Sequence, residues 1–179
     1  MTNSHARVNV RPICSFPDHA GGALAVAWAA NGTTLATADE RGVHLWDAPK
    51  GTKLNDLFGP AEGVVALTWS PDGSRIAAAA GRVIWFWGQG GVARIESPDG
   101  AIVALAWSPD GRYLAWAGRG MDDPAIHVWD LSANREIVRL GGVDAPLTAL
   151  AWSPDGQMIA ATADDGMVRG WTPQSTDPL

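Results

Sequence analysis

The chain has 179 residues, of which 46% are apolar and 18% are charged, and its net charge is −6. This length fits one domain, and the composition excludes an intrinsically disordered chain. The acidic balance argues against a nucleic-acid-binding protein. The single cysteine, Cys14, excludes an intrachain disulfide and fits a reducing compartment, and we expect it to be a small buried side chain.

The two ends of the chain are polar, and no secretory signal is visible in residues 1–11. No stretch approaches the roughly 20 apolar residues that a membrane helix needs. We therefore expect a cytoplasmic protein without membrane contact. Eleven arginines against two lysines, together with many alanines, suggest a GC-rich bacterial genome.

Four segments of the sequence repeat with a period close to 42 residues, and each closes on a tryptophan. The closing tryptophans are Trp46, Trp87, Trp129 and Trp171. Residues alternate in type within each repeat, which is typical of β-strands. In chain order the predicted strands are 24–28, 35–38, 43–46 and 52–58; 64–69, 76–80, 83–87 and 92–96; 102–107, 114–117, 126–129 and 135–140; and 147–152, 159–163 and 167–171.

The opening strand of each repeat has one face of large residues and one of small residues. The large residues include Val26 and Trp28, Val65 and Leu67, and Val103 and Leu105, while alanine dominates the other face. Both faces are apolar, so both are predicted to be buried, with a large face packing on the small face of the next sheet. Such alternate filling is expected in tapered β architectures.

A Ser-Pro-Asp-Gly sequence follows three of the opening strands, at 70–73, 108–111 and 153–156. Proline fixes φ at the second position and glycine accepts a positive φ at the fourth, which predicts a tight hairpin turn. Asn31-Gly32 takes this place in the first repeat. A further copy at 97–100 precedes a strand, and we interpret it as an ordinary loop.

The repeat resembles the WD-repeat β-propeller family. Trp46-Asp47 and Trp129-Asp130 match the closing dipeptide of that family, and residues 161–168 match its turn between the second and third strands. The family often contains a hydrogen-bonded group of histidine, serine or threonine, a carboxylate and tryptophan. The residues that match it here are His19, Thr37, Glu40 and Trp46. The turn sequence is also similar to that of periplasmic TolB-like propellers, but the closing tryptophans favour the WD-repeat family.

The predicted fold is all-β, a propeller of four four-stranded blades that is either a four-bladed ring or half of a larger one. Its domain spans residues 8–173, between tails at 1–7 and 174–179. The closing strand is expected at 8–16 and the repeats at about 17–58, 59–96, 97–140 and 141–173. Three arrangements stay open: a four-bladed or incomplete monomer, a homodimer forming an eight-bladed ring with exchanged N-terminal strands, and a half-propeller completed by another chain.

No motif for catalysis, for a cofactor or for a metal stands out. His44 and His127 hold equivalent positions, two residues before closing tryptophans, and are explained by the repeat. Trp85 and Trp116 fall outside the repeating tryptophan positions and are expected to be packing residues. We predict no catalytic residue, no cofactor and no metal.

Charged residues recur at the turns between the second and third strands, and the resembled family favours this end for docking. A partner-binding rim is predicted there, formed by Asp39, Glu40, Arg82, Asp122, Asp123, Asp164 and Asp165. The alternative is that these carboxylates only stabilise their own turns.

The predicted function is a non-catalytic scaffold for protein–protein interaction. The alternatives are a ligand-binding or hydrolytic propeller with an axial site, and a truncated half-propeller that needs a second chain.

Overall fold

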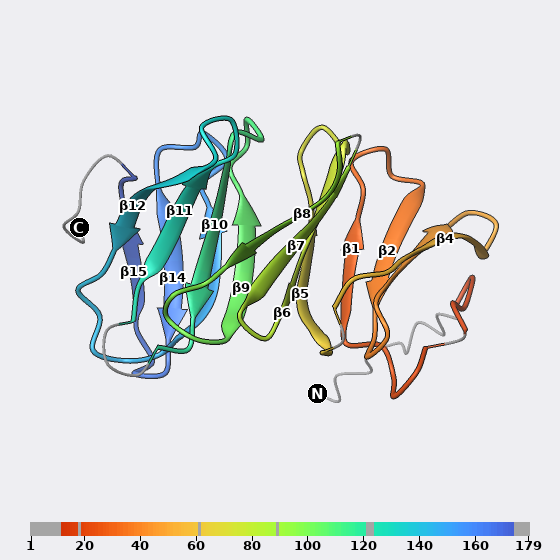
Figure 1. Cartoon of the computed structure of the whole chain (residues 1–179), viewed down its shortest axis with the longest axis horizontal. Helices are drawn as coiled ribbons and strands as arrows, with labels where there is room; N and C mark the ends of the chain where they lie inside the picture. Colours follow the sequence, from red (N-terminus) through yellow and green to blue (C-terminus); the bar gives the residue numbers. More distant parts are fainter. Residues whose placement is uncertain (1–11, 18, 61, 89, 121–123, 174–179) are drawn as a thin grey trace, which may run out of the picture.

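The chain folds into a row of small antiparallel sheets that stand side by side along an arc (Figure 1). The computed structural model describes residues 12–17, 19–60, 62–88, 90–120 and 124–173. Within these ranges there are fifteen strands and no helix, so none of the described segments is a helix that could cross a membrane. The all-β prediction is confirmed.

Each sheet is one propeller blade, and its strands pair in chain order from the innermost strand outward. The first blade contains β1 (Ala25–Trp28), β2 (Thr34–Ala38), β3 (Val43–Asp47) and β4 (Thr52–Leu57). The second contains β5 (Val64–Trp69), β6 (Arg75–Ala80), β7 (Val83–Gly88) and β8 (Gly91–Glu96). The third contains β9 (Ile102–Trp107), β10 (Tyr113–Gly118), β11 (Ile126–Asp130) and β12 (Arg135–Leu140). The fourth contains β13 (Leu147–Trp152), β14 (Ile159–Ala163) and β15 (Val168–Trp171).

The core lies between the blades. The alanine-rich small face of one blade packs against the large face of the next, so large faces meet small faces as predicted, but in the opposite order along the chain. Between blades 1 and 2, for example, Ala36 and Ala38 lie in one cluster with Ile76 and Trp87. Small side chains on one side let the two sheets approach closely, and the large side chains of the other blade fill the space.

The blades form an open arc. The innermost strands pack in the order β1, β5, β9 and β13, and blades 1 and 4 lie at opposite ends of the row (Figure 1). The prediction that both faces of every opening strand are buried is therefore wrong at the two ends. In blades 2 and 3, which have neighbours on both sides, the opening strands are partly or fully buried except at Val65.

The tight turns form as predicted. Gly32, Gly73, Gly111 and Gly156 all have φ between 68° and 71°, the left-handed region that glycine enters without strain. In the second blade the amide of Gly73 donates to the carbonyl of Ser70 at 2.9 Å. The serine–proline–aspartate–glycine sequence thus fixes the register of each first hairpin.

Two details of the opening strands differ from the prediction. Val65 and Val103 were expected on the large faces, but β-bulges at the starts of β5 and β9 shift the register. As a result Val65 is 54% exposed, while its neighbour Val64 is fully buried. A bulge adds one residue to a strand and so changes which face the earlier residues occupy.

Only part of the prediction for the N-terminal region can be compared with the structure. Of the strand expected at 8–16, residues 12–16 are described and lie outside any strand, and 8–11 lie outside the described residues. Cys14, expected to be buried, is a half-buried free thiol. The tails predicted at 1–7 and 174–179 also lie outside the described residues. Within the described residues, blade 4 has three strands.

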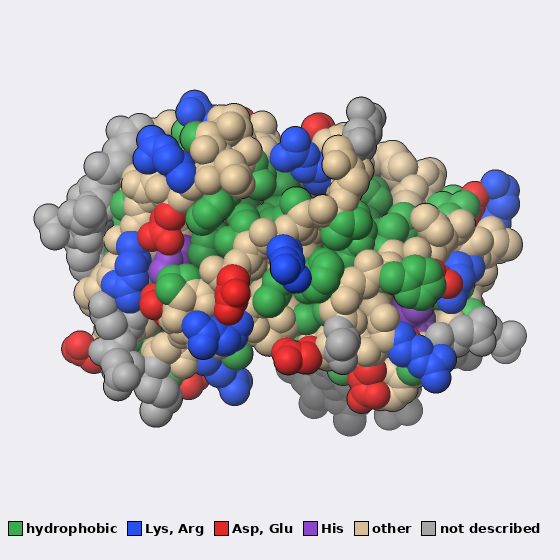
Figure 2. All heavy atoms as spheres, in the orientation of Figure 1, with side chains coloured by type: hydrophobic (Ala, Val, Ile, Leu, Met, Phe, Trp, Pro, Cys, Tyr) green, Lys and Arg blue, Asp and Glu red, His purple; other side chains and the backbone are tan. Residues whose placement is uncertain are grey.

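The outer side of the arc is less polar than expected for edge strands. Leu54, Val92 and Ile137, on β4, β8 and β12, are 55%, 58% and 37% exposed. Figure 2 shows apolar side chains reaching the surface over the middle of the arc, between the outer strands of neighbouring blades. A groove of about 330 Å³ opens there between blades 1 and 2, lined by Leu57, Trp87 and others.

Candidate docking surface

The arc has two ends that differ in the loops they carry. At one end, here named the hairpin end, lie the tight turns between first and second strands. At the other, here named the linker end, lie the turns between second and third strands and the linkers between blades. The described residues of the predicted rim belong to the linker end, because strands in an up-and-down blade alternate in direction.

Asp39 is buried, so it is not available on a rim. Its carboxylate accepts hydrogen bonds from the amides of Ala20 and Arg41, both at 2.7 Å, and lies 3.1 Å from Nε2 of His44. Burial alone would raise the pKa of Asp39, but the amide hydrogen bonds and His44 outweigh it and hold the pKa below its ordinary value. Asp39 thus fixes the turn and the linker before β1.

The remaining rim residues have different surroundings. Glu40 and Asp164 are exposed, whereas Asp165 is paired with Arg169 at 2.6 Å. Arg82 donates to the carbonyls of Ser97 and Pro98, at 3.2 and 3.0 Å. Asp122 and Asp123 lie outside the described residues. The structure therefore does not gather these residues into one acidic patch, and the rim stays a prediction.

The polar group of blade 1 contains three of the four residues that the family resemblance implied. Oγ1 of Thr37 lies 2.7 Å from Nε2 of His19 and accepts a hydrogen bond from Nε1 of Trp46 at 2.8 Å. The carboxylate is not Glu40, as predicted, because that side chain is exposed. The buried carboxylate of this turn is Asp39, whose position at the end of β2 directs it inward.

Blade 3 contains a second polar network that the sequence did not reveal. His127 is 1% exposed, and its ring lies between Asp99, 2.8 Å from Nε2, and Glu136, 3.0 Å from Nδ1. Arg139 also pairs with Asp99, at 3.0 Å. Burial alone would raise the pKa of Asp99, but Arg139 and His127 outweigh it and hold the pKa below its ordinary value.

Trp116 completes this network. It is fully buried, stacks on His127 with ring centroids 5.0 Å apart, and donates through Nε1 to Oγ of Ser97 at 3.3 Å. The expectation that Trp116 is a packing residue is confirmed. Residues 97–100 form a loop before β9, as predicted, and Ser97 and Asp99 of this loop bond to Trp116 and His127 of blade 3.

His44 and His127 are held by carboxylates of their own surroundings. His44 and His127 each lie between two carboxylates of their own blade, and His44 Nδ1 is 2.6 Å from Asp56. Nε2 of His44 lies close enough to the Asp39 carboxylate for an ion pair, but the geometry does not meet that of a hydrogen bond. Among the described residues, no group of three or more histidine, cysteine or acidic side chains is arranged to hold a metal ion.

A pocket of about 380 Å³ opens at the linker end, between blade 2 and the linker that precedes it, and is here named the linker pocket. Its lining residues are Pro60, Glu62, Ala80, Gly81, Arg82, Val83, Trp85 and Glu96. Trp85 is half-buried and stacks on Trp87 at 6.4 Å. Glu62 and Glu96 are exposed and make no hydrogen bond or ion pair with another described residue. Two unpaired carboxylates beside an indole suit a cationic side chain.

The floor of the linker pocket depends on one glycine. A Cβ atom on Gly59 would lie 2.9 Å from the ring of Trp85 and 3.0 Å from that of Trp87. The linker therefore passes directly over both indoles only because residue 59 has no side chain. Trp87 Nε1 donates to the carbonyl of Phe58 at 3.3 Å, which holds the linker there.

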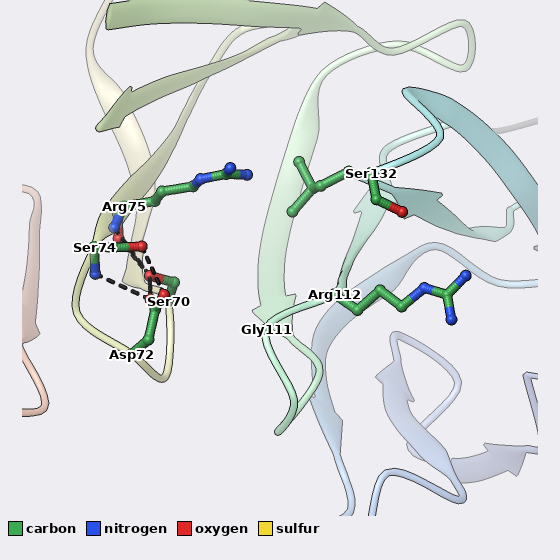
Figure 3. A pocket seen from close by; sticks show the side chains of 8 residues that line it. Ser70, Asp72, Ser74, Arg75, Gly111, Arg112 and Ser132 are labelled. Atoms are coloured by element: carbon green, nitrogen blue, oxygen red, sulfur yellow. Dashed lines mark hydrogen bonds between the residues drawn. The ribbon is translucent and has the colours of Figure 1, made fainter. Parts of the chain in front are cut away.

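The hairpin end has a smaller pocket of about 200 Å³ between blades 2 and 3 (Figure 3). Asp72 accepts hydrogen bonds from Ser70 and Ser74, and those bonds lower its pKa to about 2. Arg112 turns away from the pocket toward Asp130, with which it pairs at 2.9 Å, while Arg75 extends into the gap. Most of the polar groups here are committed to their own turns, so this pocket offers less to a partner.

The sequence of the chain matches a known protein family. A sequence model described as "Eukaryotic translation initiation factor eIF2A" matches residues 18–165, from the linker before β1 to the turn after β14. No curated protein matches the chain.

Proposed function

We propose that this chain, which belongs to the eIF2A family of WD40-like β-propellers, is a non-catalytic domain that binds other proteins. The observation that carries the proposal is the linker pocket. It combines a stacked indole, Trp85, with the unpaired carboxylates of Glu62 and Glu96. The chemistry of the pocket fits a lysine or arginine side chain from a partner protein.

The rigidity of the linker end supports this assignment. Loops present contacts well when a stiff scaffold holds them, because little entropy is then lost on binding. In blade 1 the buried Asp39 fixes the turn after β2, and in blade 3 His127 and Asp99 fix the loop before β9. Both networks lie at the linker end.

A non-catalytic role is supported by what surrounds the candidate acid–base groups. Both ring nitrogens of His127 face carboxylates, and Trp116 stacks on the ring, so the imidazole has no open side toward a substrate. A general base needs hydrogen-bond reach to the proton that it removes. The buried carboxylate of Asp39 is likewise occupied by backbone amides.

The family description suggests which partners to test first. It names a translation initiation factor, and we propose a basic protein segment of the translation apparatus as the occupant of the linker pocket. The net charge of −6 agrees with a positively charged partner, since opposite charges speed association.

Co-purification tests this proposal. The wild-type chain, a Glu62→Gln/Glu96→Gln variant and a Glu40→Gln control are immobilised and exposed to the same lysate, and captured proteins are quantified. Glu40 is an exposed acidic residue of the linker end that does not line the pocket. We expect a basic protein with the wild type and the control that is lost from the double variant. Equal capture by all three, or capture by none, would refute the proposed pocket.

A further inference from the structure

The three interfaces inside the arc follow one scheme. The small face of a blade is covered by the large face of the next blade, and each contact forms its own apolar cluster. A hydrogen bond marks the scheme at two of the interfaces. Trp69 Nε1 donates to the carbonyl of Ala27, and Trp152 Nε1 to that of Ala106, both at 3.2 Å. The acceptor is in each case the residue before the opening-strand tryptophan of the preceding blade.

Among the described residues, no blade lies in front of the large face of blade 1. Val26 and Trp28 are 63% and 57% exposed. Trp107, which holds the same position in the third repeat as Trp28 in the first, is 7% exposed. The difference comes from the missing neighbour, because the residue type and the strand position are the same.

The small face of blade 4 is uncovered in the same way. Ala160 is exposed and Val168 is 68% exposed, whereas their counterparts in blade 3, Ala115 and Ile126, are fully buried. Ala151, whose carbonyl corresponds to those of Ala27 and Ala106, lies on this face as well. Exposed apolar surfaces of this kind mark interaction sites in folded proteins.

We propose that a second copy of this chain covers both faces. The large face of blade 1 in one copy packs on the small face of blade 4 in the other, and the same contact repeats at the second junction. The indole N–H of Trp28 then has the carbonyl of Ala151 in the other copy as its acceptor. Two arcs of four blades close an eight-bladed ring with twofold symmetry, a blade number that propellers use.

The second copy is the occupant because the two open faces are the two halves of one known interface. A different partner would need to present a blade of the same repeat, with large residues on one side and alanines on the other. The chain itself supplies both. The linker pocket lies elsewhere, between blade 2 and the linker that precedes it, so the ring and the proposed docking function are separate.

The N-terminal segment supports the same arrangement. The ring of Phe16 lies 5.4 Å from that of Trp46, on the large face of blade 1. In blade 2 the equivalent place is taken by Leu57, the last residue of outer strand β4, which packs against the cluster that contains Trp87. Phe16 therefore sits where the end of a preceding blade's outer strand belongs. The blade that precedes in the ring is blade 4 of the other copy, whose β15 has no partner strand on its outer side within the described residues.

Absolute mass from light scattering on a sizing column tests the ring, since one chain is 18.8 kDa. We expect twice this mass for the wild type and a monomer for both Trp28→Arg and Ala151→Arg. Val92→Arg is the control, because Val92 is 58% exposed, like Trp28, but lies on outer strand β8. It is expected to keep the doubled mass. Circular dichroism checks that each variant is folded.

Mixing the two monomeric variants distinguishes this contact from any other dimer. A mixed pair keeps one intact junction, between the small face of the Trp28→Arg chain and the large face of the Ala151→Arg chain. The mixture should therefore associate at concentrations where each variant alone is monomeric. A monomeric wild type, a dimer that both variants leave intact, or an open chain of more than two copies would overturn the ring. A monomer that still captures a partner through the linker pocket would overturn the proposed ring but not the proposed docking function.

Discussion

Trp28 and Trp107 allow one substitution to be made twice at the same repeat position, once with a neighbouring blade and once without. Trp107 is 7% exposed and Trp28 is 57% exposed. A tryptophan of roughly 250 Å² then buries about 230 Å² at position 107 and about 110 Å² at position 28. Replacement by alanine also leaves a cavity only where a neighbouring blade encloses the site.

We expect Trp107→Ala to lower the free energy of unfolding by about 3–4 kcal/mol, in the range of buried tryptophan truncations. The lower part of that range applies because Trp107 Nε1 is buried without a hydrogen-bond partner, so its removal costs less. Trp28→Ala should cost about 1–2 kcal/mol in the monomer, because less than half as much area is lost.

Urea unfolding, followed by circular dichroism at a concentration where the chain is monomeric, measures both costs. The difference between the two substitutions is the quantity that matters. Equal costs would refute the large-on-small packing of neighbouring blades, since Trp107 would then gain nothing from blade 2. A Trp28→Ala cost that rises with protein concentration would instead reflect the covered face in the ring.

Three further substitutions test the turns and the buried network, each by urea unfolding. The pKa of Asp72 is lowered to about 2 by hydrogen bonds from the serines of its turn, so its contribution to stability is complete above about pH 4 and is lost as the pH falls toward 2. Asp72→Asn should therefore flatten the pH dependence of stability in this window, and an unchanged profile would contradict the assignment. Gly73→Ala should cost about 1–2 kcal/mol because φ is +69°, while Gly90→Ala, where φ is not positive and no atom lies near, should be close to neutral. Ser97→Ala should cost about 1–3 kcal/mol, because it removes the acceptor of the buried Trp116 N–H, and a neutral result would mean that another acceptor replaces it.

The strands and their order could be predicted because the signal is local and repeated four times. Alternation fixes the faces, and the Ser-Pro-Asp-Gly turns fix the hairpins. The bulges at Val65 and Val103 could not be predicted, since one extra residue changes the face without changing the composition of the strand. The exposure of Trp28 could not be predicted for another reason: a repeat specifies how neighbouring blades pack but not whether a preceding blade is present.

The polar networks were harder to predict because their partners are far apart in the sequence. Asp99 meets His127 and Arg139, 28 and 40 residues away, and its loop has the same sequence as the hairpin turns. The choice between Asp39 and Glu40 depends on which of two adjacent side chains points inward, and the end of β2 decides it. The linker pocket combines residues of a linker with the ends of β7 and β8, so no single sequence motif could predict it.

The central claim is that partners dock at the linker end of this propeller, and site-specific photo-crosslinking tests it most directly. A photoreactive amino acid is placed at Arg82, an exposed residue that lines the linker pocket but is not one of its two carboxylates, and in a separate variant at Gln157, an exposed residue of the hairpin end in blade 4. The account predicts a defined adduct with a basic protein from position 82 and none from position 157. No adduct from position 82, or the same adduct from both positions, would contradict it.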